Sequence, residues 1–214
     1  MSKLSKLHFW QWFKRHHQEY LTLKSKSKKE TAYWLNELSA HVHACFRFLG
    51  YSIEYQPDGI ARLTISVNGK AKHFKKAEDL VAKAPIIPGW SFVALEDPRP
   101  ITFLLEKQIL DTGIDPQDFY FSADDYDPRF TSLIIYHPLC TRKNERIFYG
   151  IACSAVYNLL GERSFGTEIG WIEVANLSGA VEDVEPIEAL PGCIAMRKSD
   201  MVIDDQGQLV TATP

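Results

Sequence analysis

The feature that most constrains the fold is an apolar segment from Arg146 to Gly161, RIFYGIACSAVYNLLG. Two apolar stripes with helical spacing lie side by side along it, so a helix here is hydrophobic around most of its circumference. A helix of that kind is usually buried in a core. Gly161 stands where helices commonly end in a left-handed residue, and the stretch from Glu168 to Leu177 reads as a strand. The sequence therefore predicts a core helix over 145–161 packed against a sheet.

The remaining pattern predicts a helix pair followed by strands. Apolar residues with helical spacing indicate helices over 8–22 and 29–49, and a lysine-rich linker, KSKSKK, separates them. Alternating segments at 51–56 and 60–67 flank a Pro-Asp-Gly turn and predict a hairpin. A short helix is expected over 74–84, before Pro85, and a central strand over 131–136.

These elements predict an α+β fold with a mostly antiparallel sheet, helices packed on one face and an N-terminal helix pair. The length of 214 residues suits one large domain or two small ones, and we expect a single domain. In it, residues 1–49 form the helical pair, residues 51–196 hold the sheet and the buried helix 145–161, and residues 198–214 form a loose tail.

Composition and charge point to no particular ligand. The 24 Lys and Arg residues oppose 27 Asp and Glu residues, and the net charge of −3 does not direct the whole chain to nucleic acid. Four cysteines lack the spacing of a zinc site, and Cys45 and Cys153 fall on apolar helical positions that favour core packing. We find no signal peptide and no apolar run of transmembrane length, and therefore expect a cytoplasmic protein with reduced thiols.

Four residues in the middle of the chain are the candidates for catalysis. His137 and Cys140 follow the central strand in the sequence HPLC, and a thiol beside an imidazole can act as a nucleophile with its base. Asp124 and Asp125 belong to an acidic loop, Asp124 to Asp127, without the central Gly and distal Glu of a calcium loop. A solvated turn is the structural interpretation of that loop. If these groups met in a cleft, they would form a hydrolase pocket.

The N-terminal segment is the candidate surface for a partner. Trp10, Trp12 and Phe13 lie among basic residues, a mixture that can bind a protein, a nucleic acid or a membrane. The structural alternative is an aromatic helix that packs on its own domain. The packed helix is the favoured interpretation; among the binding roles, a protein partner ranks above a nucleic acid or a membrane. No histidine pair has the spacing of a metal site, so we expect no metal and no cofactor.

Three stretches resemble bacterial domains of unknown function: GWSFVAL (89–95), DFYFSADDYDPRFTSLIIY (118–136) and AVYNLLGERSFGTEIGWIEV (155–174). In such domains a helix ends in a Leu-Gly-Glu step and leads into a strand. The resemblance covers about residues 85–176 and implies a fold outline, with no activity and no catalytic residue to carry over.

We therefore expect a non-catalytic binding or regulatory protein of the bacterial cytoplasm. The alternative is a hydrolase with its pocket near His137, Cys140 and the Asp124–Asp127 loop. The sequence does not indicate a ligand, a pathway or an oligomeric state.

Overall fold

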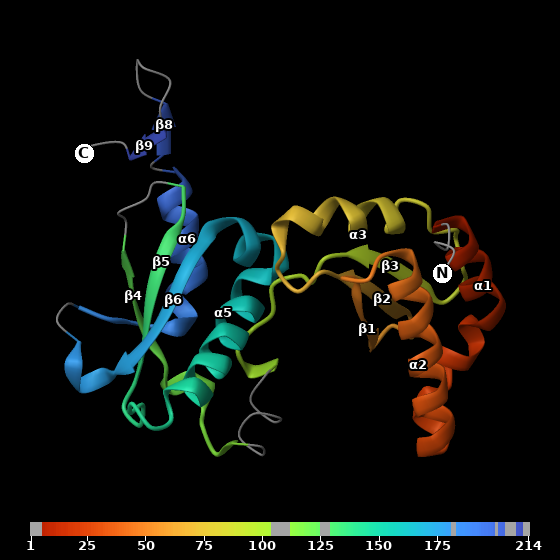
Figure 1. The fold of residues 1–214 in the computed structure, drawn as a ribbon, viewed down its shortest axis with the longest axis horizontal. Coiled ribbons are helices and arrows are strands. Elements are labelled where there is room, and N and C mark those ends of the chain that lie inside the picture. The colour runs from red at the N-terminus through yellow and green to blue at the C-terminus, as the bar shows by residue number, and fades with distance from the viewer. Residues whose placement is uncertain are drawn as a thin grey trace. The chain divides into compact units, whose positions relative to one another are not determined.

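The computed structural model describes residues 6–103, 112–124, 129–180, 183–199, 201–203 and 209–211. Its internal contacts divide the chain into two compact units, Met1–Glu96 and Asp97–Pro214 (Figure 1). Each unit combines helices with a mixed sheet, and the first begins with a helix pair, so the predicted α+β class is confirmed. The single-domain organisation stays a prediction.

The helix pair of unit 1 consists of α1 (Lys6–Leu21) and α2 (Lys28–Cys45), which contact each other. A capping box begins α2, because the Ser27 hydroxyl accepts the N–H of Glu30 and the Glu30 carboxylate accepts the N–H of Ser27. The lysine-rich linker therefore ends in a specific helix start. A short 3₁₀ turn, η1 (Leu23–Ser25), includes the first two residues of the linker.

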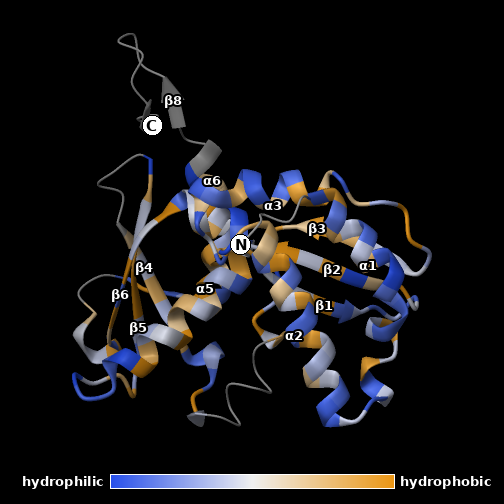
Figure 2. Cartoon of the chain, turned by 45° about the vertical axis from the view of Figure 1, so that its right-hand side comes forward, coloured by the Kyte–Doolittle hydropathy of each residue, from blue (hydrophilic) through white to orange (hydrophobic). Residues whose placement is uncertain are grey.

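The sheet of unit 1 has the strand order β1-β2-β3. The predicted hairpin is present: β1 (Gly50–Tyr55) and β2 (Ala61–Ser66) are antiparallel, with Ile53 opposite Leu63. β3 (Trp90–Ala94) runs parallel to β2, and the crossover between them contains η2 (Ala71–His73) and α3 (Phe74–Val81). Figure 2 shows α3 with mostly hydrophilic colour interrupted by hydrophobic bands, as expected of a helix that packs one side on β2 and β3.

The sheet of unit 2 has the order β6-β5-β4-β7, formed by β4 (Tyr120–Asp124), β5 (Thr131–His137), β6 (Ile169–Asn176) and β7 (Glu185–Pro186). β5 is central, as its continuous apolar sequence predicts, and it pairs antiparallel with β4 and parallel with β6. The connection from β5 to β6 contains α5 (Glu145–Glu168), which packs on both strands.

Shorter elements of the described part of unit 2 include η3 (Pro116–Asp118), η4 (Leu177–Gly179), η5 (Ile187–Ala189) and α6 (Leu190–Ser199). Within the stretch predicted to be a loose tail, β8 (Met201–Ile203) pairs antiparallel with β9 (Leu209–Thr211).

The predicted core helix is present, but it does not end at Gly161. That residue has φ 72° and ψ 166°, and helical structure resumes beyond it as far as Glu168. The side of α5 that includes Ala152, Ala155 and Val156 is buried, whereas Ile147 and Tyr149 are exposed. The helix is therefore buried along one side and not around its whole circumference.

Each unit has its own hydrophobic core. The core of unit 1 joins α1, α2 and α3 to the sheet, and that of unit 2 joins α5 and α6 to β4, β5 and β6. Among the residues that the structure describes, no helix combines the length and the apolar character needed to span a membrane.

Candidate binding surface

The aromatic residues of α1 belong largely to the core of unit 1. Trp10 and Phe13 are buried, and the indole N–H of Trp10 donates to the backbone oxygen of Leu80 at 2.7 Å. Trp12 is half-buried, with its ring stacked on His41 at a centroid distance of 3.7 Å. Of the three residues predicted to bind a partner, Trp10 and Phe13 therefore hold α1 in place and present no surface. The packing alternative describes them better.

His137 is buried at the end of β5, where its ring lies against Phe119 and Phe148. Its Nδ1 accepts the N–H of Leu139 at 3.0 Å, and its Nε2 has no hydrogen-bond partner in the described part of the chain. Burial lowers the pKa of this imidazole, against the opposing effect of Asp118 and Asp115. A neutral ring in an apolar site is favoured.

Cys140 is also buried, and it makes no hydrogen bond to the Nε2 of His137. Burial, assisted by Glu145, raises the pKa of its thiol. A nucleophilic thiolate needs the opposite environment, with a lowered pKa and a base in contact. The two side chains are thus close in sequence but do not form an activated pair.

The structure does not describe the side chains of the two acidic candidates for catalysis, Asp124 and Asp125. Asp125 and residues 126–128 lie outside the described residues, and only the backbone of Asp124, at the end of β4, is described. In the described ranges no group of three or more His, Cys, Asp and Glu side chains could hold a metal ion.

A different group of side chains does converge in unit 1. Two segments far apart in sequence, the α2–β1 loop and the stretch from η2 into α3, contribute cations and rings to it. We call its exposed cations the basic cluster: Arg47, Lys70, Lys72, Lys75 and Lys76. The same two segments contribute three half-buried rings: Phe46, Phe48 and His73.

Ring contacts organise the basic cluster. The rings of Phe48 and His73 stack at 4.9 Å with an interplanar angle of 9°, and Phe46 packs edge-on against both. The guanidinium carbon of Arg47 lies 4.4 Å from the centroid of Phe48, and the Lys70 ammonium lies 5.5 Å from the same ring. These are cation–π distances, so the rings hold charged groups close together.

A tight turn brings the two segments together. After β2, Asn68 and Gly69 both have positive φ, 54° and 72°, which Asn and Gly tolerate best. The Ser66 hydroxyl accepts the N–H of Asn68 at 3.0 Å and fixes the start of the turn. The chain then enters η2, which places His73 against the α2–β1 loop.

The net charge of the whole chain gives no sign of the basic cluster, because the two units differ in charge. Unit 1 has 15 Lys and Arg against 8 Asp and Glu, a net charge of +7, and unit 2 has 9 against 19, a net charge of −10. The total of −3 hides this division. The signal in the sequence was the run from 68 to 76, NGKAKHFKK, together with the charge of each half.

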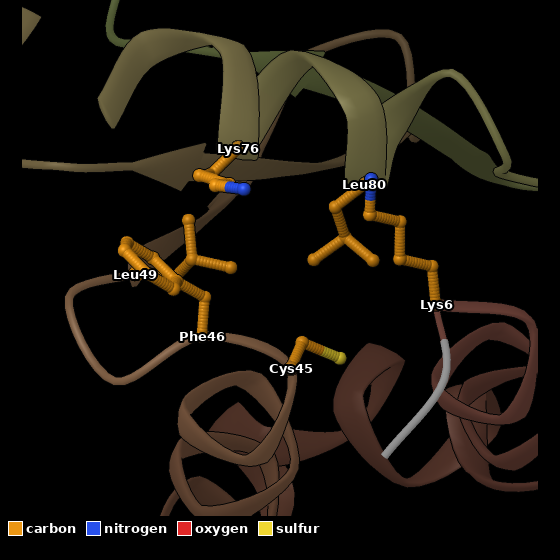
Figure 3. A pocket seen from close by; sticks show the side chains of 6 residues that line it. All are labelled: Lys6, Cys45, Phe46, Leu49, Lys76 and Leu80. Atoms are coloured by element: carbon orange, nitrogen blue, oxygen red, sulfur yellow. The ribbon is translucent and has the colours of Figure 1, made fainter. Parts of the chain in front are cut away.

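A pocket of about 110 Å³ adjoins the basic cluster in unit 1 (Figure 3). Its lining comes from α1, the end of α2 with the following loop, and α3: Lys6, Cys45, Phe46, Leu49, Lys76 and Leu80. At its edge the Lys6 ammonium pairs with Asp79 at 3.0 Å, and Lys75 reaches the same carboxylate at 3.4 Å. Burial raises the pKa of Cys45 to about 11 despite the nearby Lys6, so its thiol is neutral near pH 7.

Comparisons with protein-family models, with curated proteins and with solved structures give no match to this chain.

Proposed function

We propose that this protein is a non-catalytic binding protein and that unit 1 binds a polyanionic partner through the basic cluster. The strongest support for this proposal is the following observation. Arg47, Lys70 and Lys76 lie over half-buried rings, and two further exposed lysines, Lys72 and Lys75, belong to the same segment, in a unit whose net charge is +7. Like charges repel, so bringing them together is unfavourable unless an anion neutralises them.

The arrangement suits a partner with repeated negative charges. Each lysine or arginine that neutralises one charge of a polyanion releases a condensed counterion, which favours binding at low salt. The cation–π contacts of Arg47 and Lys70 with Phe48 limit the freedom that these side chains lose on binding. The basic cluster therefore has both the charge and the partial order of a polyanion-binding surface.

Hydrolysis has less support. The thiol of Cys140 and the imidazole of His137 are buried and neutral, and they are not hydrogen-bonded to each other. A catalytic thiol needs a base within hydrogen-bond reach or a lowered pKa. Among the residues that the structure describes, the hydrolase alternative consequently has no geometric observation in its favour.

The test compares two triple variants of the full-length chain with equal changes of charge. In one, Lys70, Lys72 and Lys75 become Gln; in the control, the exposed lysines Lys14, Lys28 and Lys29 become Gln. Fluorescence anisotropy measures binding to labelled single-stranded oligonucleotide and to labelled poly-glutamate over a series of salt concentrations. We expect the cluster variant to lower the slope of log K against log salt for the oligonucleotide by about 2 to 3, and the control to change it much less.

The two probes separate the sources of negative charge. Stronger binding of the oligonucleotide would indicate a nucleic acid, and stronger binding of poly-glutamate would indicate an acidic polypeptide. If neither binds at low salt, or if both triple variants weaken binding equally, the basic cluster is not a polyanion site.

A further inference from the structure

The pocket beside the basic cluster joins an apolar interior to a cationic edge. Leu49 and Leu80 are almost completely buried, and Phe46 adds a half-buried ring. In Figure 3 the two leucine side chains point into the space between Lys6 and Lys76, and the Cys45 thiol lies on its other side. A neutral thiol behaves as a small apolar group, so the interior of the pocket is hydrophobic.

The charges at the edge are unbalanced. The Asp79 carboxylate accepts a hydrogen bond from the Lys6 ammonium, and the Lys75 ammonium lies 3.4 Å from it. One negative charge is therefore shared by two positive charges. Lys76 forms no ion pair within the described residues, and its ammonium lies 5.8 Å from the centroid of Phe46. An anionic group placed at this edge would therefore meet a net positive charge.

The volume limits what can enter. A closed apolar cavity of about 150 Å³ is known to hold benzene, so a pocket of about 110 Å³ has room for an alkyl group of roughly three to five carbons. A longer chain or a ring system would extend into solvent.

We propose that this pocket binds a small aliphatic monocarboxylate, with its alkyl chain against Leu49 and Leu80 and its carboxylate at the ammonium of Lys76. The alkyl chain would replace water at the partly exposed Cys45 and Phe46 side chains, beside the buried leucines, and the charge-assisted contact would orient the carboxylate. The proposal is separate from that of polyanion binding, because it rests on the pocket.

The experiment is calorimetric titration of the full-length protein with three compounds that divide the ligand into its parts. Butyrate has the alkyl chain and the charge, butyramide has the chain without the charge, and acetate has the charge with a shorter chain. We expect butyrate to bind with a dissociation constant on the order of 1 mM, as suits so few atoms, and the other two to bind about tenfold more weakly.

Three variants locate the binding. Cys45→Leu fills the pocket and should abolish the heat of butyrate binding. Lys76→Met removes the charge, keeps an unbranched side chain of similar length and should weaken affinity about tenfold. Lys83→Met removes an exposed lysine that does not line the pocket, and it should leave affinity unchanged. If Cys45→Leu does not fold, the butyrate affinities of Lys76→Met and Lys83→Met still show whether Lys76 takes part in binding.

Butyramide binding as tightly as butyrate would overturn the proposal, as would butyrate affinity that is unchanged in Lys76→Met. Undetectable butyrate binding to the unmodified protein would overturn it as well. The two proposals fail separately, because the triple variants that test polyanion binding alter no residue of the pocket lining.

Discussion

The imidazole of His137 is held as a neutral ring by its surroundings. It lies between Phe119 and Phe148, and its Nδ1 accepts a backbone N–H. Burial lowers its pKa, because the charged form would lose its hydration. The residue chosen for its possible chemistry thus has a structural role at the end of β5.

This environment predicts an acid sensitivity. The unfolded chain exposes the imidazole, which then takes up a proton near its ordinary pKa of about 6.5, while the folded protein takes it up only at lower pH. Below about pH 6.5 the unfolded state binds more protons, so the free energy of unfolding falls as the pH falls through this window. Above it the contribution of His137 is constant.

His137→Phe, which keeps a ring in the same site, should make the free energy of unfolding less dependent on pH between 7.5 and 5.5. Urea denaturation at several pH values measures this slope for both proteins. The comparison of slopes remains valid if the variant is less stable at every pH. Equal slopes would mean that the folded protein protonates His137 as readily as the unfolded chain does.

At the scale of the element, the break in α5 depends on one glycine. Gly161 has φ 72° and ψ 166°, a region that is almost restricted to glycine. A Cβ at this position would lie 2.7 Å from the Cδ and the N of Pro98. The backbone just after Pro98 is fixed to the same helix, because the N–H of Arg99 donates to the oxygen of Asn158 at 2.7 Å.

Gly161→Ala should therefore lower the free energy of unfolding by about 2–5 kcal/mol, through backbone strain and the clash with Pro98. Gly150→Ala is the matched control, because Gly150 lies in the same helix and a Cβ there meets no atom within 4 Å. The control should raise the stability by about 0.5–1 kcal/mol. Equal effects of the two substitutions in chemical denaturation would contradict this account of the break.

The elements that could be predicted from sequence are those with strong local patterns. The hairpin around Pro57, the helix that ends before Pro85 and the central strand over 131–136 all have such patterns. The sequence marks Gly161 as a special position, but a local pattern cannot distinguish a helix end from a break. Nor does it show the close approach of Pro98, which is distant in sequence. The parallel pairings of β2 with β3 and of β5 with β6 are likewise set by long-range packing.

At the scale of the whole molecule, the net charge of the entire chain conceals the candidate site. The −3 of the protein is the sum of +7 in unit 1 and −10 in unit 2. The position of the division depends on tertiary contacts, which the sequence does not give. The aromatic residues that were expected to bind a partner are mostly core, since Trp10 and Phe13 are fully buried, and the rings beside exposed cations come from the α2–β1 loop.

Two separate hydrophobic cores predict that the units unfold separately. Each unit has the size of an ordinary domain, and the two cores share no residue. Four of the five tryptophans, at positions 10, 12, 34 and 90, belong to unit 1, and Trp171 of unit 2 is exposed. Tryptophan fluorescence therefore reports mainly on unit 1, whereas far-ultraviolet circular dichroism reports on both units.

We expect urea unfolding curves from the two methods not to coincide for the unmodified protein. Gly161→Ala should shift the dichroism curve to lower urea and leave the main fluorescence transition where it was, because the substitution lies in unit 2. Coincident curves that move together in this variant would show one cooperative domain. In that case the single-domain organisation expected from the sequence would be correct, and the two cores would be coupled in unfolding.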